Sequence, residues 1–146
     1  MESVKVGRAL GVDLGERRIG LALSDPSRTV ASPHDVLTRR ASHADDHTAI
    51  AGLARGAGVT TIVVGLPLSL SGRDGPAAKA ARAEADELRA AVGLGIDVVL
   101  HDERLTTVTA EAALREAQMR WSDRQKVVDM VAAAVMLQSW LDTVQS

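Results

Sequence analysis

The 146-residue sequence contains no cysteine, phenylalanine or tyrosine, and only two tryptophans. The absence of cysteine excludes disulfides, thiolate metal sites and cysteine nucleophiles, and it suits a reducing compartment such as the cytoplasm. The shortage of aromatic side chains argues against a surface on which bases of single-stranded nucleic acid stack. We therefore expect a cytoplasmic protein that folds around an aliphatic core.

The sequence also lacks a strong excess of either charge. It has 17 Lys and Arg against 19 Asp and Glu, a net charge of −2. This balance excludes a protein whose whole surface binds nucleic acid through positive charge. No uninterrupted apolar run approaches 18 residues, so we expect no membrane association. The length predicts one domain, residues 1–146, large enough to fold without disulfides or structural metal.

Short apolar runs predict the strands. Residues 9–14 and 19–24 predict a hairpin around the turn Gly15–Arg18. Residues 60–64 and 96–100, rich in β-branched side chains, predict two further strands. A strand around residues 29–37 is a weaker prediction, because Pro33 lies within it.

Helical periodicity fills the intervals between the strands. Ser42 is a candidate cap for a helix through Ile50 and Ala57, and a second helix fits between Pro76 and Gly93. A third is predicted around residues 110–117, and a last one from the capping box at residues 122–125 to about Leu141. This order predicts an α/β fold in which the later strands are parallel. The long loop at residues 65–76 is a candidate functional segment.

Asp13 is the first carboxylate in an unusual place. It lies near the end of the first strand and shares a face with Gly11 and Gly15, which leave room for a close approach. The alternative is an aspartate that caps the following turn.

Asp129 is the second, since it is the only charge in the otherwise apolar run 127–137. Such a run predicts a buried helix, in which a lone carboxylate needs a partner or a metal. The partner could be an arginine, with Arg17, Arg18 and Arg104 as candidates.

Glu103 and its neighbour Asp102 directly follow the last predicted strand. Strand alternation places them on opposite faces, and the sequence alone does not say which one points inward. Asp13 and this pair both lie at carboxyl ends of strands, where open α/β sheets place their sites. Convergent carboxylates without cysteine or paired histidines favour Mg²⁺ or Mn²⁺ over zinc, and one or two such ions can hydrolyse phosphodiesters.

Four motifs resemble one family. They are Gly11-Val12-Asp13-Leu14-Gly15 with Gly20-Leu21-Ala22, Val63-Val64-Gly65-Leu66-Pro67, His101-Asp102-Glu103-Arg104-Leu105-Thr106-Thr107, and Asp129 with Ala132-Ala133 and Leu137-Gln138. In this order, over nearly the whole chain, they are similar to the YqgF/RuvX family of Holliday-junction-resolvase-like proteins, also described as pre-16S rRNA 5′-end processing nucleases.

The resemblance implies a ribonuclease H-like fold with a five-stranded mixed sheet flanked by helices. It also implies that Asp13, Glu103 and Asp129 are the catalytic acids and the ligands of one or two Mg²⁺ or Mn²⁺ ions. The implied partners are precursor rRNA or branched DNA, and through the former the ribosome or its precursors. Monomer and homodimer both remain open, as does the choice between RNA and DNA.

Binding of nucleic acid requires locally concentrated positive charge, because the net charge is negative. Basic residues outnumber acidic ones in residues 1–40 and 104–126. The candidates for phosphate contacts are Arg17, Arg18, Arg73, Arg104, Arg120, Arg124 and Lys126, with Arg115 in the same segment. For each of them the alternative is an ordinary solvated side chain. His101 is expected to be a structural neighbour of the site rather than a ligand. Trp121 is expected to pack at the entry of the last helix, and the alternative is contact with a base or sugar.

Two other classes of protein remain as alternatives. The Asp13-Leu14-Gly15 motif with Gly20 also resembles the first phosphate loop of the actin/hexokinase superfamily, which would make the protein a nucleotide-binding phosphotransferase. That superfamily needs two lobes and several hundred residues, which argues against it. The other alternative is a non-catalytic module that binds nucleic acid or associates with the ribosome.

Overall fold

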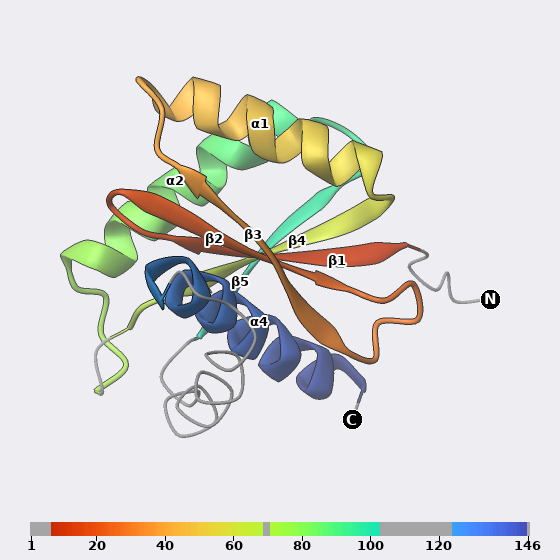
Figure 1. The fold of residues 1–146 in the computed structure, drawn as a ribbon. Helices are drawn as coiled ribbons and strands as arrows, with labels where there is room; N and C mark the ends of the chain where they lie inside the picture. Colours follow the sequence, from red (N-terminus) through yellow and green to blue (C-terminus); the bar gives the residue numbers. More distant parts are fainter. Residues whose placement is uncertain (1–6, 69–70, 103–123, 146) are drawn as a thin grey trace.

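The computed structural model describes residues 7–68, 71–102 and 124–145, and its centre is a five-stranded sheet (Figure 1). The strands are β1 (Arg8–Leu14), β2 (Arg18–Ser24), β3 (Ala31–Thr38), β4 (Val59–Leu66) and β5 (Asp97–Asp102). Their order across the sheet is β3-β2-β1-β4-β5. The pairs β1–β2 and β2–β3 are antiparallel, whereas β1–β4 and β4–β5 are parallel. The predicted five-stranded mixed sheet is confirmed.

Helices cover both faces of the sheet. Helices α1 (His43–Gly56) and α2 (Pro76–Val92) lie on one face, and α4 (Arg124–Gln145) crosses the other (Figure 1). Two parallel strands need a crossover connection, because the chain must return to the end of the sheet where the first strand began. Helix α1 precedes β4 and helix α2 precedes β5, and they provide these connections.

The predicted cap of α1 and both predicted ends of α2 agree with the structure. Ser42 Oγ accepts a hydrogen bond from the amide of Asp45 at 3.1 Å and so caps α1. Pro76 is the first residue of α2, and Gly93 ends it with a φ of 71°, in the region that glycine tolerates. Helix α4 runs four residues beyond the predicted end. The helix predicted at 110–117 lies outside the described residues.

Alternation along β1 divides the core into two layers. Leu10 and Val12 belong to the cluster that includes residues of α1 and α2, whereas Ala9 belongs to the cluster with α4. On the α4 face, a Cβ added to Gly11 would lie 2.8 Å from Leu137 Cβ. The glycine on this face therefore lets α4 lie close against the central strand.

Helix α4 is unusually apolar. By length and composition alone, Lys126–Val144 could cross a membrane, but half of that segment is buried inside the protein. Its buried side chains, Leu137 and Leu141 among them, pack against the sheet. Its composition is therefore explained by its position in the core.

The edge strand β3 accommodates Pro33 as a proline-containing strand must. Pro33 lies opposite Ala22, next to an irregularity in the β2–β3 register between Leu21 and Ala22. Proline has no N–H to donate to a neighbouring strand. Because β3 is an edge strand, no strand on its open side loses a hydrogen bond. The weaker of the strand predictions is thus also confirmed.

Arg28 donates several hydrogen bonds at the end of the sheet where β1 begins. It has a φ of 58°, and its Nε donates to the Gly7 carbonyl at 2.9 Å. Its Nη2 donates to Thr60 Oγ1 at 2.8 Å and Thr61 Oγ1 at 2.9 Å, and its guanidinium lies 5.9 Å from the ring centre of Trp140. One arginine therefore ties the β2–β3 turn to β4 and α4.

Candidate functional site

Asp13 and Asp129 are the two described carboxylates of the predicted site, and Gly20 lies between their backbones. Asp13 is paired across the hairpin with Gly20, which lies on the same face of the sheet. A Cβ added to Gly20 would overlap the carbonyl oxygen of Asp129 and lie 2.8 Å from its carbonyl carbon. The first turns of α4 are therefore in backbone contact with the strand next to Asp13, and residues 116 positions apart come together.

Arg18 is the partner of Asp129. Its Nε donates to Asp129 Oδ2 at 2.6 Å, and both side chains are partly buried. Strand alternation places Arg18 and Gly20 on the same face of β2, toward α4. Of the three arginines that the sequence offered as partners for Asp129, Arg18 makes the ion pair, and Arg104 lies outside the described residues.

Asp13 has no such counter-ion among the described residues. Burial, and to a lesser degree the nearby Asp129 carboxylate, raise the pKa of Asp13 from its ordinary 3.8 to about 6. An ionised carboxylate that is both buried and repelled by a second one is stabilised by an added cation. The donor chemistry of this pair fits a hard divalent ion such as Mg²⁺ or Mn²⁺.

The third predicted acid, Glu103, lies outside the described residues. In the part of the chain that the structure describes, no group of three carboxylate, histidine or cysteine side chains could hold a metal ion. The strand that precedes Glu103 is described to its last residue. His101 Nε2 lies 2.9 Å from Ser139 Oγ on α4, so His101 faces the helix and Asp102 alternates to the opposite face.

The predicted phosphate-binding cations that can be placed lie on elements near this end of the sheet. Arg17 is exposed in the β1–β2 turn, and Arg73 is exposed in the connection between β4 and α2. Lys126 is exposed in the first turn of α4, three residues before Asp129. Arg18, the fourth predicted cation that the structure describes, is paired with Asp129. The remaining predicted cations, Arg104, Arg115 and Arg120, and the side chain of Arg124 lie outside the described residues.

Sequence reasoning did not identify the structural role of Gly20. It appears in the family motif, but the motif does not say why a side chain is excluded there. The hairpin register carries the missing signal, because a tight turn at residues 15–17 places Gly20 directly opposite Asp13. Its close approach to α4 depends on packing between elements distant in sequence.

A solved structure of similar fold is that of T. thermophilus RuvC in complex with a Holliday junction substrate. The superposition has a TM-score of 0.56 and covers 96% of this chain and 97% of that one, at 14% sequence identity. The likeness confirms the ribonuclease H-like fold.

Curated relatives extend the likeness to sequence. A protein of Anaeromyxobacter dehalogenans (strain 2CP-C), described as "Putative pre-16S rRNA nuclease", is 48% identical over 135 residues, which are 92% of this chain and 96% of the relative. A protein of Roseiflexus sp. (strain RS-1) with the same description is 42% identical over 141 residues, 97% of this chain and 98% of the relative. The family model described as "RuvX: Holliday junction resolvase" matches residues 7–143. The chain therefore belongs to the RuvX family.

Proposed function

We propose that this protein is a divalent-metal-dependent nuclease that hydrolyses phosphodiester bonds of nucleic acid. The observation that carries the proposal is the convergence of Asp13 and Asp129 beside Gly20, at the carboxyl end of the central strand. Membership of the RuvX family and the names of the curated relatives support the same activity. The absence of cysteine suits work in the reducing cytoplasm.

The metal would be held by Asp13 and Asp129, with Glu103 as the third ligand. Asp102, the neighbouring carboxylate, alternates to the face away from α4, because His101 faces that helix. The choice of Glu103 as third ligand rests on the family resemblance. A divalent ion in this position supplies Lewis-acid activation of water and stabilises the charge that develops on the departing oxygen. Hydrolysis adds water across one P–O bond of the backbone.

Basic residues of the chain would orient the metal ligands and bind the phosphates of the substrate. Arg18 fixes the rotamer of Asp129 through their hydrogen bond and limits the repulsion between the two aspartates. We expect Arg17, Arg73 and Lys126, whose side chains are exposed, to contact backbone phosphates of the substrate. Since the sequence has few aromatic residues, we expect recognition of backbone and shape with little base specificity.

We propose precursor 16S rRNA as the substrate, following the name of the curated relatives, with branched DNA as the competing substrate. The family resemblance points to the 5′ end of this precursor as the site of cleavage. The test presents precursor rRNA ends, single-stranded RNA, duplex DNA and a four-way DNA junction to the purified protein. Mg²⁺, Mn²⁺ and EDTA are run separately. We expect cleavage of the rRNA precursor with either metal and none in EDTA.

The same panel separates the alternatives. Cleavage of the junction alone would make branched DNA the substrate. Binding to nucleic acid without cleavage in any metal would contradict a nuclease and favour a non-catalytic binding module. Stabilisation by ATP in a melting experiment, without nuclease activity, would favour the phosphotransferase alternative.

Replacement of Arg18 by glutamine tests its role as counter-ion. We expect Arg18→Gln to bind Mn²⁺ about two- to fivefold more tightly, because a partly exposed ion pair contributes up to about 1 kcal/mol and no longer competes for Asp129. Titration calorimetry of the protein without nucleic acid measures this affinity. Arg8→Gln, at the opposite end of the sheet, is the matched control. Weaker Mn²⁺ binding by Arg18→Gln would show that Arg18 mainly orients the ligand.

A further inference from the structure

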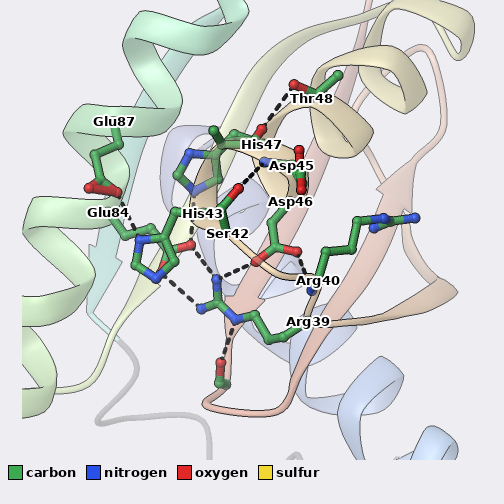
Figure 2. A network of polar contacts seen from close by, with 12 residues as sticks. Arg39, Arg40, Ser42, His43, Asp45, Asp46, His47, Thr48, Glu84 and Glu87 are labelled. Carbon is green, nitrogen blue, oxygen red and sulfur yellow. Dashed lines mark hydrogen bonds and ion pairs between the residues drawn. The ribbon is translucent and has the colours of Figure 1, made fainter.

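A buried cluster of charged side chains lies on the face of the sheet away from α4 (Figure 2). Arg39, just after β3, donates from Nη1 to Glu84 Oε2 at 2.5 Å and from Nη2 to Glu84 Oε1 at 2.8 Å. Its Nη1 also lies 3.1 Å from Asp46 Oδ2. His47 Nε2 lies 2.9 Å from Glu84 Oε2. The cluster therefore connects α1, α2 and the segment between β3 and α1.

The cluster is almost closed to solvent. Asp46, His47 and Glu84 are 1%, 2% and 5% exposed. Burial opposes ionisation of Glu84, but the hydrogen bonds from Arg39 and His47 outweigh it, so the pKa of Glu84 is lowered. Buried charged groups of this kind add little net stability compared with well-packed apolar side chains. Their value is geometric, because each hydrogen bond fixes a direction as well as a distance.

What the cluster fixes is the turn between β1 and β2. Arg39 Nε donates to the Gly15 carbonyl at 3.0 Å, and the Arg39 amide donates to the Arg17 carbonyl at 2.8 Å. The turn itself is closed by the Gly15 amide, which donates to the Arg18 carbonyl at 3.0 Å. Asp13 lies two residues before Gly15, and Arg18 holds Asp129. Arg39 thus supports the segment whose two flanks carry the candidate site.

The β1–β2 turn lies beside a cavity, so packing alone holds it less firmly than it would hold an enclosed segment. A cavity of about 460 Å³ lies between the turn and helices α1 and α2, and it is lined by Leu14, Gly15, Arg39 and Glu84 among others. Next to this cavity the turn has fewer packing contacts than a fully enclosed segment would have. The Arg39 side chain is only 15% exposed, and directed hydrogen bonds from its guanidinium can hold a backbone at a fixed position next to such a space.

We propose that Arg39 is a positioning residue of the nuclease site, which sets the β1–β2 turn and thereby the relative placement of Asp13 and the Arg18–Asp129 pair. The inference rests on the proposed nuclease function for its catalytic consequence. It predicts a role in positioning for a cluster that lies on the face of the sheet away from α4.

The test is Arg39→Lys, which keeps the charge but loses the planar fork. One ammonium group cannot reach the Gly15 carbonyl and both carboxylates in the same geometry. We expect kcat for metal-dependent cleavage to fall about 10–100-fold, the usual effect of groups that orient metal ligands, while KM changes less than about twofold. We also expect hydrogen exchange of the Gly15 amide to quicken about tenfold, since its turn is no longer held.

Arg28→Lys is the matched control. It removes an equivalent fork from the other end of the same sheet, where Arg28 binds Gly7, Thr60 and Thr61. We expect a comparable loss of thermal stability but unchanged kcat and unchanged exchange at Gly15. If Arg39→Lys folds poorly, Glu84→Gln loosens the fork while Asp46 still balances the charge, and we expect an intermediate fall in kcat.

Unchanged exchange at Gly15 in Arg39→Lys would overturn the proposal, whatever the cleavage result. Equal losses of kcat in Arg39→Lys and Arg28→Lys at equal stability would also overturn it, because a general structural role would then explain both. A wild type that cuts nothing would instead refute the nuclease function. In that case faster Gly15 exchange, together with weaker Mn²⁺ binding by Arg39→Lys, would still support the positioning role.

Discussion

Asp13→Asn is expected to lose cleavage activity and gain thermal stability. The loss should exceed the roughly 10–100-fold cost of disturbing an outer-shell partner, because a direct ligand is removed. The gain follows from charge. The carboxylate of Asp13 is ionised at neutral pH against burial and against Asp129, whereas an amide of the same shape has neither cost.

The size and pH dependence of the gain follow from the raised pKa of Asp13. Its value of about 6 in the folded protein lies above the ordinary 3.8, so folding favours the protonated form. The contribution of protonated Asp13 to the free energy of unfolding is therefore fully present below about pH 4, and it is lost as pH rises through 6. The rise of the Asp13 pKa from 3.8 to about 6 corresponds to about 3 kcal/mol as an upper limit. At pH 7.5 we expect the Tm of Asp13→Asn to exceed that of the wild type by roughly 3–8 °C.

The measurement is thermal unfolding in EDTA between pH 4 and 8, with cleavage measured in parallel in Mn²⁺. The difference in Tm between the wild type and Asp13→Asn should shrink below pH 6 and vanish near pH 4. The exposed Asp45 on α1 provides a control, since Asp45→Asn should keep full activity. A variant Asp13→Asn that is less stable than the wild type at pH 7.5 would mean that Asp13 is a structural carboxylate.

Two residues of the candidate site, Asp13 and Asp129, could be predicted from the sequence. Asp13 and Asp129 stood out because each carboxylate interrupts an apolar pattern, and an isolated charge in such a place requires compensation. Alternation along β1 also predicted correctly that Asp13 shares a face with Gly11. These inferences use local periodicity, which the sequence contains directly.

Arg39 and its partners illustrate what the sequence could not reveal. Arg39, Asp46 and Glu84 belong to three separate segments, and each alone resembles a solvated charged residue. They are buried together only because α1 and α2 pack side by side on one face of the sheet. The pairing of Asp129 with Arg18, rather than with Arg17, likewise depends on the face of β2 that turns toward α4.

The strand boundaries show a smaller difference of the same origin. β4 runs from Val59 to Leu66, beyond the predicted 60–64 at both ends. The sequence pattern places Gly65 in the long loop at residues 65–76, outside the predicted strand. In the sheet it pairs with His101 of β5, so hydrogen bonding to a neighbour overrides the local preference.

Gly20→Ala is expected to have the largest effect on stability of any change proposed for this protein. The new methyl group would overlap the Asp129 carbonyl oxygen, and this obstacle is helix backbone, which cannot rotate away as a side chain could. Overpacking of a core costs about 1–3 kcal/mol, which in a chain of this length lowers Tm by roughly 2–12 °C.

The methyl group would also disturb the site. Relief of the overlap requires α4 to move away from β2, and Asp129 would move with it, away from Asp13 and Arg18. We therefore expect Gly20→Ala to lose at least tenfold in Mn²⁺ affinity, measured by calorimetry at a temperature where the variant remains folded, about 1.4 kcal/mol of binding free energy.

Gly52→Ala is the matched control for this substitution. Gly52 lies within α1, and a Cβ added there would meet no other atom within 4 Å. Alanine in a helix is preferred to glycine, so Gly52→Ala should stabilise the protein by about 0.5–1 kcal/mol and leave Mn²⁺ binding unchanged. If Gly20→Ala lowered Tm but bound Mn²⁺ as tightly as the wild type, the contact between β2 and α4 would serve packing alone. A simultaneous loss of both identifies this glycine as the point at which close packing of α4 on the sheet creates the carboxylate pair.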